Sequence, residues 1–214
     1  MFTAHHITTQ KTARIFTYGQ LTEKTKMAWL VTHGYGFLAE YFIKKFDCLN
    51  PEEHFVVVPE ALNRFYTQGL SGRVGASWMT TEDREYEIRD YILYLDNVYE
   101  TLNLHKAPKI AGLGFSQGAA TIARWFQLTH KRVDHLIFWG GSVPEDVLKQ
   151  EKIKSMPVYS VLGDTDEFVT EEVKSKVLEN YRNNNLTFSQ IFYKGGHAIV
   201  TEPLIQLSAQ LTLS

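Results

Sequence analysis

The residues with the clearest chemical meaning lie at positions 114–118, which read Gly-Phe-Ser-Gln-Gly and match the pattern G-x-S-x-G. An apolar stretch at 109–115 predicts a buried strand before the serine, and residues 118–127 predict a helix after it. A serine in such a strand–turn–helix exposes its hydroxyl as a nucleophile. Glycines on both sides let strand and helix cross closely because they lack a Cβ atom. An ordinary turn with a helix-capping serine is the alternative, but this context favours Ser116 as a nucleophile.

A serine hydroxyl is a weak nucleophile and needs a general base in contact with it. With this motif, the catalytic groups follow one another along the chain as serine, acid and histidine. Three histidines follow Ser116: His130 ends the helix after it, His135 begins a strand, and His197 follows two glycines just past the last expected strand. Because loops at strand ends carry catalysis in open sheets, His197 is the predicted base.

The acid is expected after the apolar strand at 158–162, where two aspartates compete. Asp164 could instead stabilise the turn through a hydrogen bond to the backbone. Asp166 lies deeper in the loop and is followed by apolar residues that could bury it. The acid would accept a hydrogen bond from His197 and so fix its tautomer and orientation. The residue pattern alone leaves both aspartates open.

Two backbone N–H groups are candidates for binding the oxyanion that forms during acyl transfer. One belongs to Gln117, the residue after the nucleophile. The other is expected in the loop after the apolar strand at 27–32, where residues 33–36 read His-Gly-Tyr-Gly. The flanking glycines allow the N–H of Tyr35 to point inward. His33 precedes the nucleophile in the chain and is expected to be structural.

Apolar strands alternate with amphipathic helices along the chain, which predicts parallel β–α–β units. No repeat or linker separates two parts, so we expect one domain over residues 1–214. The first two strands are expected to form a hairpin, and residues 61–81 form the longest irregular stretch. Expected strands lie at 4–9, 12–18, 27–32, 55–58, 109–115, 135–139, 158–162 and 187–193. Expected helices lie at 118–127, at 171–181, after Pro203, and along the apolar stripe at 88–102, with the acidic stretch 82–85 at the start of that helix.

Composition excludes several other classes of function. The net charge is −2, which does not suggest a nucleic-acid or anionic-membrane partner. The single cysteine, Cys48, fits a reducing compartment. No signal peptide and no apolar run of about 18 residues is present, so we expect no membrane span and a cytoplasmic protein. The adjacent His5 and His6 lack metal-ligand spacing, so no metal and no cofactor is predicted.

Six motifs, in the same order along the chain, resemble the phospholipase/carboxylesterase family of α/β hydrolases, the acyl-protein-thioesterase-like small serine esterases. They are HGYG at 33–36, PEA at 59–61, GASW at 75–78, GFSQGAA at 114–120, GDTDEFV at 163–169 and GGH at 195–197. The resemblance implies the α/β-hydrolase fold, with a mostly parallel central sheet, helices on both faces and no large lid. The family's aspartate stands in a D-x-x-V pattern, which selects Asp166. The chain departs from the family at Glu167, where a proline is usual.

The resemblance and the residues together predict hydrolysis of small-molecule carboxylic esters or thioesters through an acyl-serine intermediate. Within residues 61–81, the side chains of Phe65, Trp78 and Met79 are expected to line an acyl groove, although packing the segment onto the core is an equal alternative. A peptidase or C–C bond hydrolase on the same groups, or a non-catalytic binding module of the same fold, are the other hypotheses. The oligomeric state is not predicted.

Overall fold

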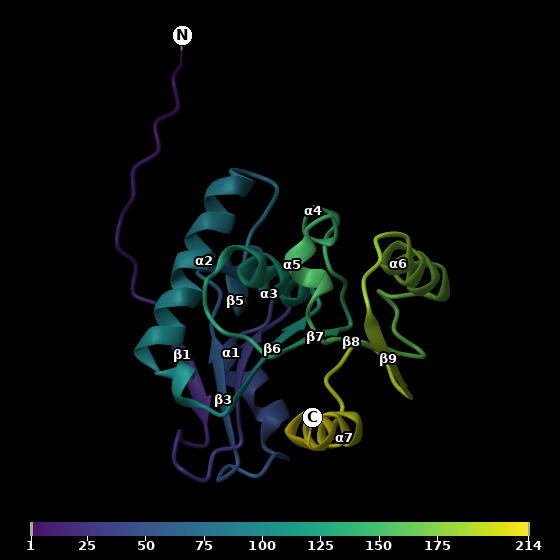
Figure 1. Cartoon of the computed structure of the whole chain (residues 1–214). Helices are drawn as coiled ribbons and strands as arrows, with labels where there is room; N and C mark the ends of the chain where they lie inside the picture. Colours follow the sequence, from purple (N-terminus) through teal and green to yellow (C-terminus); the bar gives the residue numbers. More distant parts are fainter. Residues whose placement is uncertain (1, 214) are drawn as a thin grey trace.

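A mostly parallel β-sheet forms the centre of the structure, a computed structural model that describes residues 2–213 (Figure 1). In spatial order, its seven strands are β1 (Ile15–Tyr18), β3 (His54–Pro59), β2 (Met27–Thr32), β6 (Lys109–Phe115), β7 (His135–Trp139), β8 (Val158–Gly163) and β9 (Phe188–Tyr193). β1 runs antiparallel to β3, and the other neighbouring pairs are parallel. The prediction of a mostly parallel sheet is confirmed.

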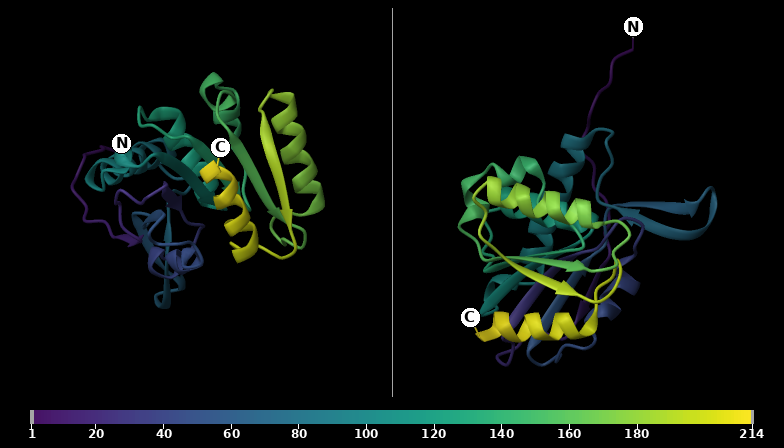
Figure 2. Two further views of the ribbon diagram at one scale, coloured as in Figure 1. Left: turned by 60° about the horizontal axis from the view of Figure 1, so that its bottom comes forward. Right: turned by 90° about the vertical axis from the view of Figure 1, so that its right-hand side faces the viewer.

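Both faces of this sheet are covered by helices (Figures 1 and 2). In β2, Ala28 and Leu30 pack on one face, whereas Met27, Trp29 and Val31 pack on the other. Burial on both faces explains why the strands are continuous apolar runs. The first face carries α2 (Arg84–Thr101), η2 (Leu104–Lys106), α3 (Gln117–Leu128), α4 (Glu145–Leu148), α5 (Glu151–Lys154) and α6 (Glu171–Asn183), and the second carries α1 (Ala39–Phe42), η1 (Ile43–Phe46) and α7 (Thr201–Leu213).

One helix boundary differs from the predictions. α2 begins at Arg84, within the acidic stretch 82–85 that was expected at its start. α7 begins at Thr201, so Pro203 lies inside its first turn, where a missing N–H breaks no helical hydrogen bond. Among residues 2–213, no helix combines the length and the apolar character needed to cross a membrane.

The expected N-terminal hairpin is wrong. Strand structure begins only at Ile15, and β1 pairs with the distant β3, with Ile15 opposite Pro59. The residues before it are almost all exposed, so the β-branched side chains at 7–9 are not buried as those of a strand in the sheet would be. This segment contacts α2 instead: the ring of His6 stacks on Tyr86 with centroids 4.1 Å apart.

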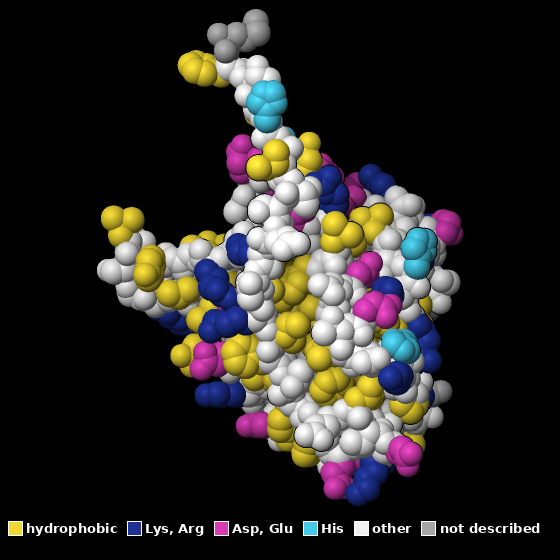
Figure 3. Space-filling model, turned by 90° about the vertical axis from the view of Figure 1, so that its left-hand side faces the viewer, with side chains coloured by type: hydrophobic (Ala, Val, Ile, Leu, Met, Phe, Trp, Pro, Cys, Tyr) yellow, Lys and Arg dark blue, Asp and Glu magenta, His cyan; other side chains and the backbone are white. Residues whose placement is uncertain are grey.

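The prediction that residues 61–81 form an irregular stretch is also wrong. They contain an antiparallel hairpin of β4 (Asn63–Gln68) and β5 (Ser71–Ser77), separate from the main sheet. The hairpin projects from the body, with hydrophobic side chains at its outer end (Figures 2 and 3). These strands were not predicted from the sequence, because most of their side chains are exposed and polar and the apolar run of a buried strand is missing. No helical lid is inserted elsewhere between residues 2 and 213.

Candidate active site

Ser116 occupies the sharp turn between β6 and α3. Its backbone angles are φ 54° and ψ −118°, a conformation that side-chain-bearing residues rarely adopt. A Cβ atom at Gly114 would lie 2.3 Å from the carbonyl oxygen of Gly118. A Cβ atom at Gly118 would lie 2.0 Å from the carbonyl oxygen of Thr32. Both glycines are therefore required by the close crossing of strand and helix, which holds the serine at the end of the sheet.

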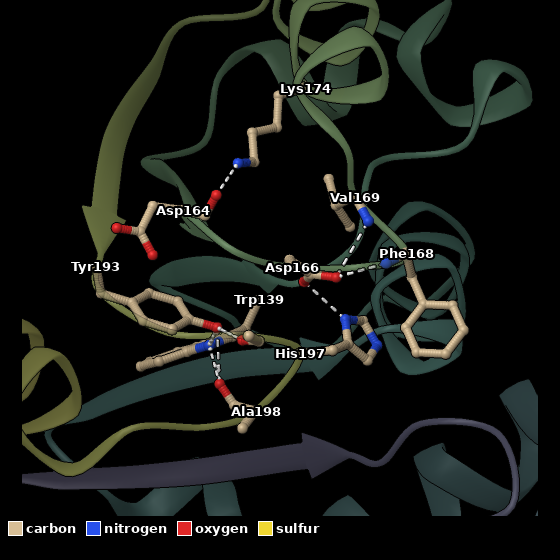
Figure 4. Close-up of polar contacts among 10 residues, drawn as sticks. Trp139, Asp164, Asp166, Phe168, Val169, Lys174, Tyr193, His197 and Ala198 are labelled. Atoms are coloured by element: carbon tan, nitrogen blue, oxygen red, sulfur yellow. Dashed lines mark hydrogen bonds and ion pairs between the residues drawn. The ribbon is translucent and has the colours of Figure 1, made fainter.

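His197 lies on the loop after β9, and its imidazole is held from several sides. Its Nδ1 atom is 2.7 Å from Oδ2 of Asp166 (Figure 4). The ring of Phe115 packs against it from the core side at a centroid distance of 4.7 Å. The ring of Phe168 packs edge-on against it at 4.9 Å and is 68% exposed. The imidazole is thus fixed between two aromatic rings, and the side chain is 11% exposed.

The loop that carries His197 is itself anchored to the sheet. The hydroxyl of Tyr193 lies 2.8 Å from the carbonyl oxygens of both Gly196 and Ala198. The indole N–H of Trp139 donates to the carbonyl of Ala198 at 2.9 Å (Figure 4). These bonds to residues on either side of the histidine limit the positions that its backbone can take.

Of the two aspartates left open by the residue pattern, Asp166 is the one that contacts the histidine. Its carboxylate is fully buried. The second oxygen, Oδ1, accepts hydrogen bonds from the backbone N–H groups of Phe168 at 2.9 Å and Val169 at 3.0 Å. Asp164 instead accepts a hydrogen bond from the N–H of Gly195 at 2.8 Å. It therefore stabilises the turn that leads to the histidine, as the alternative role predicted.

Ser116 and His197 both border a pair of glycines after β7. A Cβ atom at Gly141 would lie 2.7 Å from the carbonyl oxygen of Ser116, and one at Gly140 would lie 3.1 Å from Nδ1 of His197. Within the described residues, the Ser116 hydroxyl makes no hydrogen bond. Such bonds commonly tighten only when substrate binds. The carboxyl ends of β6, β8 and β9 thus bring serine, aspartate and histidine to one edge of the sheet.

The two predicted oxyanion donors lie on segments beside the serine. The N–H of Gln117 is in the first turn of α3, where a helix supplies no acceptor. The loop after β2 passes close by, since a Cβ atom at Gly34 would lie 3.2 Å from Cβ of Ser116. No hydrogen bond from the N–H of Tyr35 is found within residues 2–213, whereas the next N–H, of Gly36, donates to Ala76 at 2.9 Å.

His33 is buried and fully engaged in structural hydrogen bonds. Its Nε2 accepts the backbone N–H of Ala61 at 3.0 Å, and its Nδ1 donates to the carbonyl of Gly34 at 2.8 Å. These partners require the neutral imidazole with its proton on Nδ1. Burial lowers the pKa of His33 below its ordinary value. The prediction that this histidine is structural is confirmed.

The three predicted substrate-binding residues lie in different environments. Phe65 is half-buried, and its ring packs against that of Tyr35 with centroids 5.0 Å apart. Met79 is also half-buried. Trp78 is only 1% exposed, and its indole N–H donates to the carbonyl of His33 at 2.8 Å. Trp78 is therefore a core residue, and its side chain has almost no surface to offer a substrate.

Sequence reasoning did not single out Phe168 as a residue that faces the site. Its exposed ring lies directly on the imidazole of His197. The sequence did contain a signal for this position. Phe168 lies two residues after Asp166, the predicted partner of His197, so its large side chain could be expected near that histidine. No cluster of at least three histidine, cysteine, aspartate or glutamate side chains among residues 2–213 could hold a metal ion.

Comparison with known proteins gives a family match and several similar structures. A family model described as Serine hydrolase (FSH1) matches residues 22–203. The structure resembles that of esterase PE8, with a TM-score of 0.70, 21% identity, and coverage of 93% of this chain and 97% of the other. It also resembles Zea mays acyl-protein thioesterase 2, with a TM-score of 0.70, 15% identity, and coverage of 94% and 99%.

A third similar structure is a phospholipase/carboxylesterase from Dyadobacter fermentans, with a TM-score of 0.63, 20% identity, and coverage of 97% of this chain and 99% of the other. Among curated proteins, none matches the chain. The family match and the shared fold confirm the resemblance inferred from the sequence motifs.

Proposed function

The chain belongs to the Serine hydrolase (FSH1) family, and we propose that it hydrolyses carboxylic esters or thioesters with Ser116, His197 and Asp166 as its catalytic triad. The observation that carries this proposal is the 2.7 Å contact between Asp166 and His197 at the sheet edge that also presents Ser116 in a strained turn. Structural neighbours described as an esterase, an acyl-protein thioesterase and a phospholipase/carboxylesterase support this substrate class.

The hydrogen bonds support a role for each group in the proposed reaction. Asp166 accepts the Nδ1–H of His197, so the lone pair of Nε2 is available to take the proton of Ser116. The serine oxygen attacks the carbonyl carbon, and the N–H groups of Tyr35 and Gln117 bind the resulting oxyanion. His197 then protonates the leaving alcohol or thiol. Water, activated by the same imidazole, releases the acid from the acyl-serine.

The surroundings of the site favour substrates with an apolar acyl group. Phe65 and Tyr35 form one aromatic pair near the oxyanion loop, and the exposed ring of Phe168 borders the base. Met79 is half-buried at the end of the same hairpin segment. We assign Phe65 and Met79 to the substrate-binding surface and add Phe168 to it. A cytoplasmic location and the absence of a nucleic-acid partner stay predictions from the sequence.

Hydrolysis of p-nitrophenyl esters from acetate to palmitate tests the proposal, with Ser116→Ala beside the wild type. Loss of a triad serine lowers kcat on the order of 10⁶-fold. Ser175→Ala, an exposed serine on α6, is the matched control and should retain full activity. A shift of the preferred chain length in Phe65→Ala would support the assignment of that side chain to the acyl group.

Two other outcomes would redirect the proposal. Wild-type protein that reacts with a fluorophosphonate at Ser116 but hydrolyses none of these esters would favour a peptidase or a C–C bond hydrolase on the same triad. Wild-type protein that neither reacts nor hydrolyses would favour a non-catalytic binding module. Equal activity of Ser116→Ala and wild type would refute the assignment of the nucleophile.

A further inference from the structure

The side chain of Gln117 contacts three consecutive residues at the end of the β4–β5 hairpin. Its amide nitrogen Nε2 donates to the carbonyl of Met79 at 2.9 Å and to the hydroxyl of Ser77 at 3.2 Å. Its amide oxygen Oε1 accepts the backbone N–H of Trp78 at 3.1 Å. Both ends of the amide are therefore engaged. The residue that follows the nucleophile is tied to a segment about 40 positions earlier in the chain.

The same segment, residues 76–79, holds the loop that carries the other predicted oxyanion donor. The carbonyl of Ala76 accepts the N–H of Gly36 at 2.9 Å, and the N–H of Ala76 donates to the carbonyl of Phe37 at 3.2 Å. The indole of Trp78 donates to the carbonyl of His33 at 2.8 Å. Residues 76–79 therefore form hydrogen bonds with the loop both before and after Tyr35. We call these four residues the oxyanion strap.

Packing between the strap and the loop is close enough that the two must move together. A Cβ atom at Gly75, the residue before the strap, would lie 2.6 Å from the carbonyl oxygen of Gly36 and 2.7 Å from its Cα. Ala76, Ser77 and Trp78 are buried, with exposed fractions of 0%, 2% and 1%. A change in the position of the strap would therefore be passed directly to the loop.

We propose that the side chain of Gln117 is a positioning residue that couples the two oxyanion donors through the strap. The backbone N–H of Gln117 would bind the oxyanion directly, whereas its side chain acts on the distant N–H of Tyr35. This inference rests on the proposed function, because it concerns the oxyanion site of the same reaction. Its physical basis is preorganisation: donors already aimed at the oxyanion need no rearrangement when the charge develops.

Substitutions of Gln117 separate the side chain from the backbone donor, since every variant keeps the N–H of residue 117. Gln117→Met keeps the approximate length but makes none of the three hydrogen bonds. Gln117→Glu keeps the shape but cannot donate to Met79. Both should lower kcat by about 10- to 100-fold, below the roughly 10²–10³-fold effect of losing a donor outright. KM should change by less than about threefold, because the lost interaction acts in the transition state.

Amide hydrogen exchange tests the coupling without any turnover. In Gln117→Met, the amides of residues 33–37 should exchange faster than in the wild type, as should those of the strap. Gln206→Ala, an exposed glutamine on α7, is the control and should change neither exchange nor kinetics. If Gln117→Met does not fold, Ser77→Ala removes one partner of the amide and supplies the same two measurements.

The possible results keep this inference distinct from the proposed function. If the variants keep kcat within about twofold of the wild type, or if exchange rises in the strap but not at 33–37, the coupling is refuted while ester hydrolysis stands. If the wild type hydrolyses no ester, the proposed function fails, and the exchange of residues 33–37 still decides whether Gln117 holds the loop.

Discussion

Asp166→Asn tests whether the buried carboxylate sets the tautomer of His197. In the structure, Oδ1 accepts the N–H groups of Phe168 and Val169, and Oδ2 faces Nδ1 of the imidazole. An asparagine must turn its carbonyl oxygen toward the two N–H donors, which leaves its NH₂ group facing His197. The imidazole can then only accept at Nδ1 and must carry its proton on Nε2. In that tautomer it cannot take the proton of Ser116.

The size of the effect follows from the cost of the opposite amide orientation. Turning the NH₂ toward Phe168 and Val169 would leave one partly buried and one buried N–H group without an acceptor, at about 1–3 kcal/mol each. A total of roughly 2–6 kcal/mol corresponds to about a 30-fold to 10⁴-fold preference for the inactive orientation. We therefore expect kcat to fall by at least about 30-fold and by as much as about 10⁴-fold, the effect known for a wrong tautomer in such a triad.

The assay is kcat on the best p-nitrophenyl ester, with thermal unfolding to verify that the variant is folded. Asp164→Asn is the matched control, because its amide oxygen can still accept the N–H of Gly195. This control should keep kcat within about threefold of the wild type, since a retained hydrogen bond leaves the turn in place. The reasoning would be refuted if Asp166→Asn kept more than about a third of wild-type kcat, or if Asp164→Asn were the more damaged variant.

Two further predictions concern stability. Gly118→Ala would place a Cβ atom 2.0 Å from the carbonyl oxygen of Thr32, against backbone that cannot move aside. The free energy of unfolding in urea should fall by about 3 kcal/mol or more, and an unchanged value would contradict the close crossing. Burial lowers the pKa of His33 in the folded state, so the unfolded chain binds more protons as the pH falls below about 6.5. Its contribution to stability is therefore present above that pH and lost below it. His33→Gln should weaken the loss of stability between pH 7.5 and 5.5, and an equal slope in both proteins would argue against it.

The central strands and the strained turn at Ser116 could be predicted from the sequence because their signals are local. Continuous apolar runs such as residues 27–32 predict strands that are covered on both faces, and the structure buries all six residues. The spacing of the glycines around Ser116 predicted a close crossing of strand and helix, and the structure shows that this crossing leaves no room for a side chain at either glycine. The alternation of strands and helices likewise predicted that most neighbouring strands run parallel.

Other elements could not be predicted, because local pattern and tertiary environment disagree. The strands β4 and β5 are mostly exposed and polar, so their pairing leaves no apolar run in the sequence. The threonines near the N-terminus favour a strand by residue type, but they stay exposed and join no strand. Propensity indicates strands only where packing supports them.

The sequence by itself determined the central parallel strands, the strained turn at Ser116 and the order of the groups that follow it, since backbone sterics and apolar periodicity act over a few residues. Only the tertiary structure decided which side chains meet. It brought Asp166 to His197, a choice that the residue pattern left open and the family resemblance had made, buried Trp78 in the core, and linked Gln117 to the oxyanion strap. Such choices depend on the direction in which each side chain leaves a loop and on burial by distant elements, which spacing along the chain does not specify.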